Sequence, residues 1–240
     1  MVQVPPPALA AVDVAEMELW ERESAPAFQY SVRAGNLVKR LTAIQDRSLC
    51  TAEKPAVASH GHCVWDAALV LAEYLQGHVQ PWRQAVELGA GVGLVGMTLS
   101  ALGVADVVLT DQAYCLPLLQ KNVEFNFSAD RRPRVRELQW GAAETDLSPD
   151  VVVASDILYN ASVFPLLVRT ICQLLATPSS VMYMTYETRN AAMEADFIKQ
   201  LEGQGLHCHG ISLEYARYAT LVPYPEEICL YRIARSHQVG

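Results

Sequence analysis

The chain has 240 residues, a length that suits one domain with a short extension better than two domains. Hydrophobic residues make up 51% and charged residues 18%, which excludes general disorder because this composition supplies a core. The formal net charge of -8 disfavours binding to phosphate backbones, so we expect no nucleic-acid partner.

Cysteine usage and the N-terminus indicate the cellular compartment. The six cysteines are scattered without a CxxC pair, which favours a reducing environment, and the N-terminus lacks the regions of a signal peptide. An uncharged stretch over residues 88–105 approaches the length of a membrane span, but its glycines favour a strand, a turn and a short helix. We expect a monomeric, cytoplasmic protein that can also enter the nucleus and does not bind membranes.

The first 25 residues are rich in proline and alanine and then acidic, which predicts a flexible segment over residues 1–25. Residues that favour strands gather at 28–33 and 37–44 on either side of Ala34-Gly35-Asn36, which predicts a β-hairpin. We predict that residues 26–240 form a single domain that carries this hairpin as an N-terminal extension.

Apolar positions recur at helical spacing from Val64 to Leu75, and Gly77 supplies a stop. Strands and helices alternate beyond this helix. The predicted strands end at residue 88 and lie near 107–110, 135–138, 151–155, 181–185, 206–213 and 228–233; the predicted helices begin near 93 and lie near 116–125, 163–175 and 191–201. This alternation predicts a mainly parallel sheet with helices on both faces.

The strongest local signal is an apolar strand that turns through glycines into a helix. The turn contains Glu87, Gly89, Ala90 and Gly91, and Asp111 ends the following strand, 20 residues after Gly91. Glycines let the backbone approach a ligand closely, and an acidic residue at the second strand end can bind ribose hydroxyls. The pattern predicts a site for a nucleoside-containing cofactor.

Two cofactor classes fit this turn. Gly91, Gly93 and Gly96 also match the glycine pattern of dinucleotide-binding proteins. Glu87 favours a methyl donor, because an anion before the turn suits a cofactor with an ammonium and a sulfonium better than a pyrophosphate. A packing turn without a ligand is the third interpretation.

Several motifs, in this order, resemble the seven-β-strand methyltransferases of family 16 and, within it, the protein-lysine methyltransferases of the methyltransferase-like 21 group. The matching stretches are residues 61–75, 87–96, 109–111, 140–141, 156–159 (Asp-Ile-Leu-Tyr) and 186–189. The resemblance runs from about residue 61 to residue 189 and fits the remaining tail only loosely. It implies an α/β class fold with a Rossmann-like, seven-stranded, mainly parallel sheet.

The resemblance also implies S-adenosylmethionine as the cofactor and assigns further site residues. It places Trp65, Trp140 and Ser155 beside the cofactor, and Asp156 and Tyr159 at the target lysine as catalytic residues. Without the resemblance, packing is the more common role of such tryptophans, and Asp156 fits a helix cap or turn former as well as it fits a functional residue.

The function implied by the resemblance is transfer of a methyl group to a lysine of a cytosolic protein of the chaperone, ATPase or translation factor class. The alternatives are methylation of another side chain or a small molecule, and a non-catalytic cofactor-binding module. Glu187 and Arg189 form an exposed pair or shape the substrate mouth. The histidine clusters at 60–63 and 207–209 lack zinc-ligand spacing, so we predict no metal site.

Overall fold

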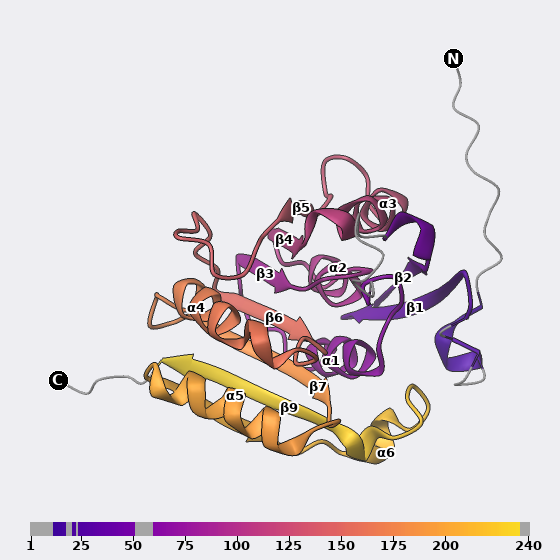
Figure 1. The fold of residues 1–240 in the computed structure, drawn as a ribbon. Coiled ribbons are helices and arrows are strands. Elements are labelled where there is room, and N and C mark those ends of the chain that lie inside the picture. Colours follow the sequence, from indigo (N-terminus) through magenta and orange to yellow (C-terminus); the bar gives the residue numbers. More distant parts are fainter. Residues whose placement is uncertain (1–11, 18–20, 23, 51–59, 236–240) are drawn as a thin grey trace.

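A seven-stranded sheet forms the centre of the molecule (Figure 1). The computed structural model describes residues 12–17, 21–22, 24–50 and 60–235. The strand order is β5-β4-β3-β6-β7-β9-β8; β3 to β7 run parallel, and β9 is antiparallel to both of its neighbours. The strands are β3 (Gln84–Leu88), β4 (Asp106–Asp111), β5 (Arg134–Glu137), β6 (Val151–Ser155), β7 (Val181–Glu187), β8 (Leu206–Ile211) and β9 (Ile228–Arg235). The predicted α/β fold class is confirmed.

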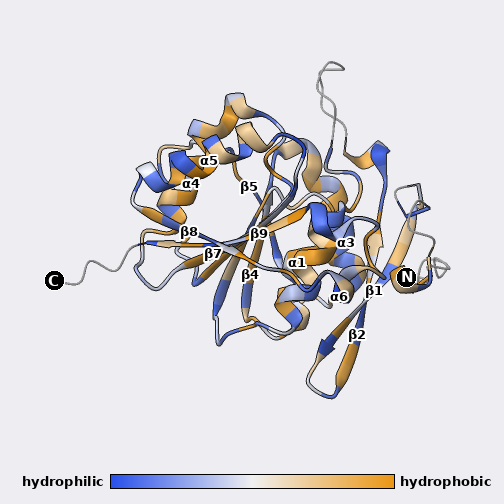
Figure 2. Cartoon of the chain, turned by 90° about the horizontal axis from the view of Figure 1, so that it is seen from below, coloured by the Kyte–Doolittle hydropathy of each residue, from blue (hydrophilic) through white to orange (hydrophobic). Residues whose placement is uncertain are grey.

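Helices cover both faces of this sheet. Helices α1, α2 and α3 pack on one face, and α4 and α5 pack on the other (Figure 1). Their bounds, with the short α6, are α1 (Asp66–Gln76), α2 (Leu94–Ala101), α3 (Leu116–Asn126), α4 (Phe164–Leu174), α5 (Ala191–Gly203) and α6 (Tyr215–Tyr218). Alternate residues of β6 serve the two cores: Val151 and Val153 pack on the α1 side, Val152 and Ala154 on the α4 side. Figure 2 shows that α4 and α5 each carry both hydrophilic and hydrophobic residues.

The predicted hairpin is present as β1 (Ala27–Ala34) and β2 (Leu37–Ile44), joined at Gly35 with φ +60°. Asn122 and Asn126 of α3 attach it to the domain. Asn122 accepts a hydrogen bond from the Ile44 amide (2.7 Å) and donates to its carbonyl (3.0 Å), and Asn126 makes the same pair with Thr42 (2.7 and 2.8 Å). These amides therefore satisfy backbone groups that a third strand would otherwise bind.

The prediction of a flexible segment over residues 1–25 falls mostly on residues outside those described. Among its described residues, the turn η1 (Val14–Glu16) places Val14 in the core, and Arg22 is also buried. Arg22 forms an ion pair with Asp66 of α1 and donates from Nη1 to the Leu221 carbonyl (2.7 Å). These contacts tie part of the segment to the domain.

The structure departs from the predicted elements mainly near the C-terminus. The strand predicted to reach residue 213 ends at Ile211, and the unpredicted helix α6 and turn η5 (Pro225–Glu227) follow it. Three other short turns are η2 (Arg47–Leu49), η3 (Ala113–Cys115) and η4 (Ala161–Val163). In the described part of the chain, no helix combines the length and the apolar character needed to cross a bilayer.

Candidate functional site

The strand order creates a crevice at the carboxyl ends of β3 and β6. After β3 the chain builds β4 and β5 on one side, and then returns to place β6 on the other side of β3. Ligands of open α/β sheets bind where the order reverses in this way. A cavity of about 390 Å³ lies there, within the range of small-molecule sites.

The glycine turn between β3 and α2 forms the floor of this cavity. Gly89, Gly91 and Gly93 have φ of +62°, +54° and +86°, a region that side chains other than glycine rarely adopt. A Cβ atom on Gly91 would lie 3.2 Å from the carbonyl oxygen of Gly61. The turn is therefore closed against the segment that precedes α1.

Glu87 lies beneath the turn and is 1% exposed. Its Oε2 accepts a hydrogen bond from the Gly96 amide in the first turn of α2 (2.8 Å). Burial raises the pKa of Glu87 to about 8; the Gly96 hydrogen bond lowers it, and the nearby Asp111 charge adds to the rise. At neutral pH this carboxyl group is therefore largely protonated.

Asp111 connects the end of β4 to the glycine turn. Its Oδ2 accepts from the Gly91 amide (2.7 Å) and its Oδ1 accepts from the Gln112 amide (2.7 Å). Burial raises the pKa of Asp111, and the two backbone hydrogen bonds oppose that rise. The carboxylate is thus held at the cavity wall beside the turn.

Aromatic and apolar side chains close other parts of the wall. Trp65 precedes α1, and its Nε1 donates to the His60 carbonyl (2.9 Å). The Trp140 ring lies over Gly89, 3.6 Å from where a Cβ atom would be. Leu138 adds apolar surface. These groups suit the flat, weakly polar parts of a nucleoside-containing ligand.

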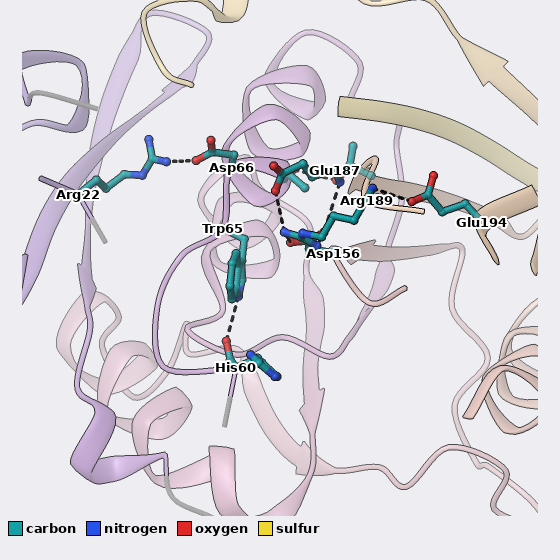
Figure 3. A network of polar contacts seen from close by, with 10 residues as sticks. Arg22, His60, Trp65, Asp66, Asp156, Glu187, Arg189 and Glu194 are labelled. Atoms are coloured by element: carbon teal, nitrogen blue, oxygen red, sulfur yellow. Dashed lines mark hydrogen bonds and ion pairs between the residues drawn. The ribbon is translucent and has the colours of Figure 1, made fainter. Parts of the chain in front are cut away.

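The catalytic residues predicted at the end of β6 also lie on the cavity wall. Tyr159 is 47% exposed, and its ring centroid lies 5.4 Å from that of His60. Asp156 has φ +56°, a conformation that aspartate tolerates better than most residues, and its side chain is 4% exposed. Its two oxygens are bound by Arg189, through Nη1 (2.8 Å) and Nη2 (2.7 Å), as Figure 3 shows.

All ten residues predicted for the site line this one cavity. They are Trp65, Glu87, Gly89, Ala90, Gly91, Asp111, Trp140, Ser155, Asp156 and Tyr159. The structure brings them together, while their individual roles stay predictions.

Sequence reasoning missed the close partner of Asp156. The sequence placed Arg189 with Glu187, and that contact exists at 2.7 Å, but the bidentate contact with Asp156 was not predicted. The register that pairs Ser155 with Thr185 brings the ends of β6 and β7 together, so a strand alignment would have given the signal. Among the described residues, no group of three or more His, Cys, Asp or Glu side chains is arranged to hold a metal ion.

Comparison with known proteins shows which family the chain is similar to. A family model described as "Lysine methyltransferase" matches residues 44–204. EEF1A lysine methyltransferase 3 of Xenopus tropicalis is 32% identical over 176 residues, covering 72% of this chain and 74% of that protein. Protein N-lysine methyltransferase METTL21A of Mus musculus is 37% identical over 148 residues, covering 59% of this chain and 66% of that protein.

A solved methyltransferase structure is similar to this chain in fold. A ribosomal protein L11 methylase from Lactobacillus delbrueckii subsp. bulgaricus superposes with a TM-score of 0.55, covering 86% of this chain and 98% of that one. Because the two are only 13% identical, the likeness concerns the fold and not the substrate.

Proposed function

Because the chain belongs to the lysine methyltransferase family, we propose that it uses S-adenosylmethionine to methylate a lysine side chain of another protein at the cavity described above. The relatives also confirm the resemblance to the methyltransferase-like 21 group. Family membership favours the methyl donor over a dinucleotide as the cofactor.

The observation that carries the proposal is the convergence of the glycine turn, two carboxyl groups and two tryptophans on one cavity. The residues present fit S-adenosylmethionine. The glycine turn lines the cavity with backbone at Gly89 and Gly91, Asp111 ends β4 where ribose hydroxyls would be bound, and Glu87 offers a carboxyl group for the cationic portion. Trp65 and Trp140 would cover the apolar portions and exclude water.

When bound, S-adenosylmethionine would supply an electrophilic methyl group on its sulfur. The lone pair of the target amine would form the bond to the methyl carbon, while the bond from carbon to sulfur breaks and leaves a neutral thioether. The chain's main task is therefore to orient a neutral amine. A free lysine has a pKa of about 10.4, so about one in 2,500 is neutral at pH 7.

We assign orientation of the amine to Asp156 and Tyr159. Both side chains line the cavity, and they lie on the loop that follows β6, close to the glycine turn. Asp156 would accept a hydrogen bond from the amine nitrogen, and the half-exposed Tyr159 would border the lysine at the mouth. Neither residue has to form a covalent bond with substrate.

The test is transfer of radiolabelled methyl from S-adenosylmethionine into a cytosolic extract. Asp156→Asn keeps a residue that tolerates positive φ and removes the charge, and Asp130→Asn makes the same change in an exposed loop. We expect a discrete protein band, labelled on lysine, that the Asp130 variant retains and the Asp156 variant loses. Label on arginine, histidine or small molecules would contradict the proposal, and binding without any transfer would favour a non-catalytic module.

The acceptor belongs, on our proposal, to the chaperone, ATPase or translation factor class. One relative is named for EEF1A, so purified EEF1A is the first acceptor to try. A cytoplasmic location with access to the nucleus, a monomeric state and the absence of a nucleic-acid partner stay predictions. Size-exclusion chromatography with light scattering tests the oligomeric state directly.

A further inference from the structure

Strand pairing brings Arg189 to Asp156. Strands β6 and β7 are parallel neighbours, and the Asp156 amide, just beyond β6, donates to the Thr185 carbonyl of β7 (2.8 Å). Arg189 lies just beyond the end of β7, so the loops after both strands meet above the same edge of the sheet. The strand pairing therefore places the two residues close enough for their side chains to bind each other.

Hydrogen bonds occupy most acceptor positions of the Asp156 carboxylate. Oδ1 accepts from Arg189 Nη1 (2.8 Å) and from the Glu187 amide (3.3 Å), and Oδ2 accepts from Arg189 Nη2 (2.7 Å). A carboxylate has about four acceptor positions, so these donors leave about one, on Oδ2. One N–H group of the target amine can occupy that position.

The guanidinium of Arg189 is itself held on several sides. Nη2 also donates to Glu187 Oε2 (2.7 Å), and the guanidinium carbon lies 5.3 Å from the ring centroid of Trp65 (Figure 3). The backbone amide donates to the buried Glu194 (2.8 Å). The pKa of Arg189 is raised, chiefly by its hydrogen bond to Asp156, so the guanidinium stays cationic.

We propose that Arg189 is a positioning residue that neutralises Asp156, so that this carboxylate orients the target amine without holding it as an ammonium. The inference rests on the proposed function. An uncompensated carboxylate beside an amine raises the pKa of that amine, and an adjacent guanidinium opposes the effect. The proton lost by the ammonium passes to solvent water at the open mouth.

The charge of Glu187 does not cancel this effect. The Glu187 side chain is 33% exposed and that of Asp156 is 4% exposed, so solvent screens the first charge more than the second. Glu187 therefore offsets less of the Arg189 charge than Asp156 does, and the Asp111 carboxylate on the same cavity wall acts equally in the wild type and in the Arg189 variants.

The experiment is the pH profile of methyl transfer into the acceptor band of the extract, measured between pH 6.5 and 9.5. Arg189→Met removes the charge and the fork, Arg189→Lys keeps the charge, and Arg40→Met makes the same change on the exposed part of β2. We expect Arg189→Met to raise the midpoint by about one pH unit and to lower the rate at pH 7 about tenfold. Arg189→Lys should restore the midpoint with a lower rate, because it lacks the bidentate fork.

A lower rate at every pH with an unchanged midpoint would overturn the inference and leave Arg189 a structural role. Thermal unfolding and binding of S-adenosylhomocysteine show whether each variant folds and keeps its cofactor site. If Arg189→Met does not fold, Arg189→Gln supplies the neutral variant. A wild-type chain that labels no lysine would overturn the proposed function as well, whereas wild-type labelling without the shift would overturn this inference alone.

Discussion

The surroundings of Glu87 predict how cofactor binding depends on pH. Burial beneath the glycine turn raises its pKa to about 8, so about nine in ten molecules carry the protonated form at pH 7. A nearby cation favours the ionised form of a carboxyl group. If Glu87 faces the cationic portion of S-adenosylmethionine, binding at pH 7 should release about 0.9 proton from Glu87, falling to about 0.25 proton at pH 8.5.

The affinity should follow the same titration. At pH 8.5 Glu87 is ionised in most molecules, so binding removes few protons from it; below pH 8 the dissociation constant rises about tenfold per pH unit. Between pH 8.5 and 6.5 the wild-type dissociation constant should therefore increase about 25-fold from this group. The variant Glu87→Gln lacks the titration, and its amide oxygen can still accept from the Gly96 amide.

The assay is isothermal titration calorimetry in buffers of different ionisation enthalpy, which counts the protons released on binding. Subtracting the Glu87→Gln value removes the titration of the ligand's own ammonium. Glu124→Gln, on the exposed side of α3, is the control and should release as many protons as the wild type. Equal proton release from the wild type and Glu87→Gln would refute the reasoning, because Glu87 would then stay protonated beneath the turn.

Two substitutions and one labelling experiment test other parts of the structure. Gly91→Ala should weaken binding of S-adenosylhomocysteine about tenfold by titration calorimetry, because φ is +54° and a Cβ atom would meet backbone; unchanged affinity would contradict this. Asn122→Leu should lower the free energy of unfolding in urea by about 2–4 kcal/mol, because the Ile44 amide and carbonyl lose their partners; a loss below about 1 kcal/mol would mean that water replaces the amide. The hydrogen bond with Cys50, and then burial, raise the pKa of the Cys115 thiol, so iodoacetamide should label it only after unfolding; labelling of the native protein at the rate of a free thiol would contradict this.

The order and type of the main elements were predictable because they depend on short-range patterns. The helical period before Gly77 and the apolar run of β6 report local backbone preference and burial, and both elements lie where expected. Part of the site was predictable for a related reason, whereas the family resemblance supplied Trp65, Trp140, Ser155, Asp156 and Tyr159. Glu87 and Asp111 each follow from the end of a strand, and parallel neighbouring strands end at the same edge of the sheet.

The contacts that the sequence did not indicate join residues far apart along the chain. Arg189 binds Asp156 across 33 residues, which requires the register of β6 and β7 and the rotamers of both side chains. The role of Asn122 as a partner of the hairpin depends on how α3 packs against β2. Arg22 lies in a proline-rich and acidic segment, whose composition gives no sign that one arginine is buried against the domain.

The attachment of the hairpin also limits what can associate with it. A two-stranded sheet has two open edges, and unpaired edges recruit strands from other molecules. On one edge the Gln29 amide donates to the Val12 carbonyl (2.8 Å), and on the other Asn122 and Asn126 bind the amides and carbonyls of Ile44 and Thr42 in β2. These side-chain amides therefore hinder self-association by strand addition where the hairpin meets the domain. Replacing the two asparagines would leave unpaired backbone groups on this edge of β2, a surface prone to aggregation.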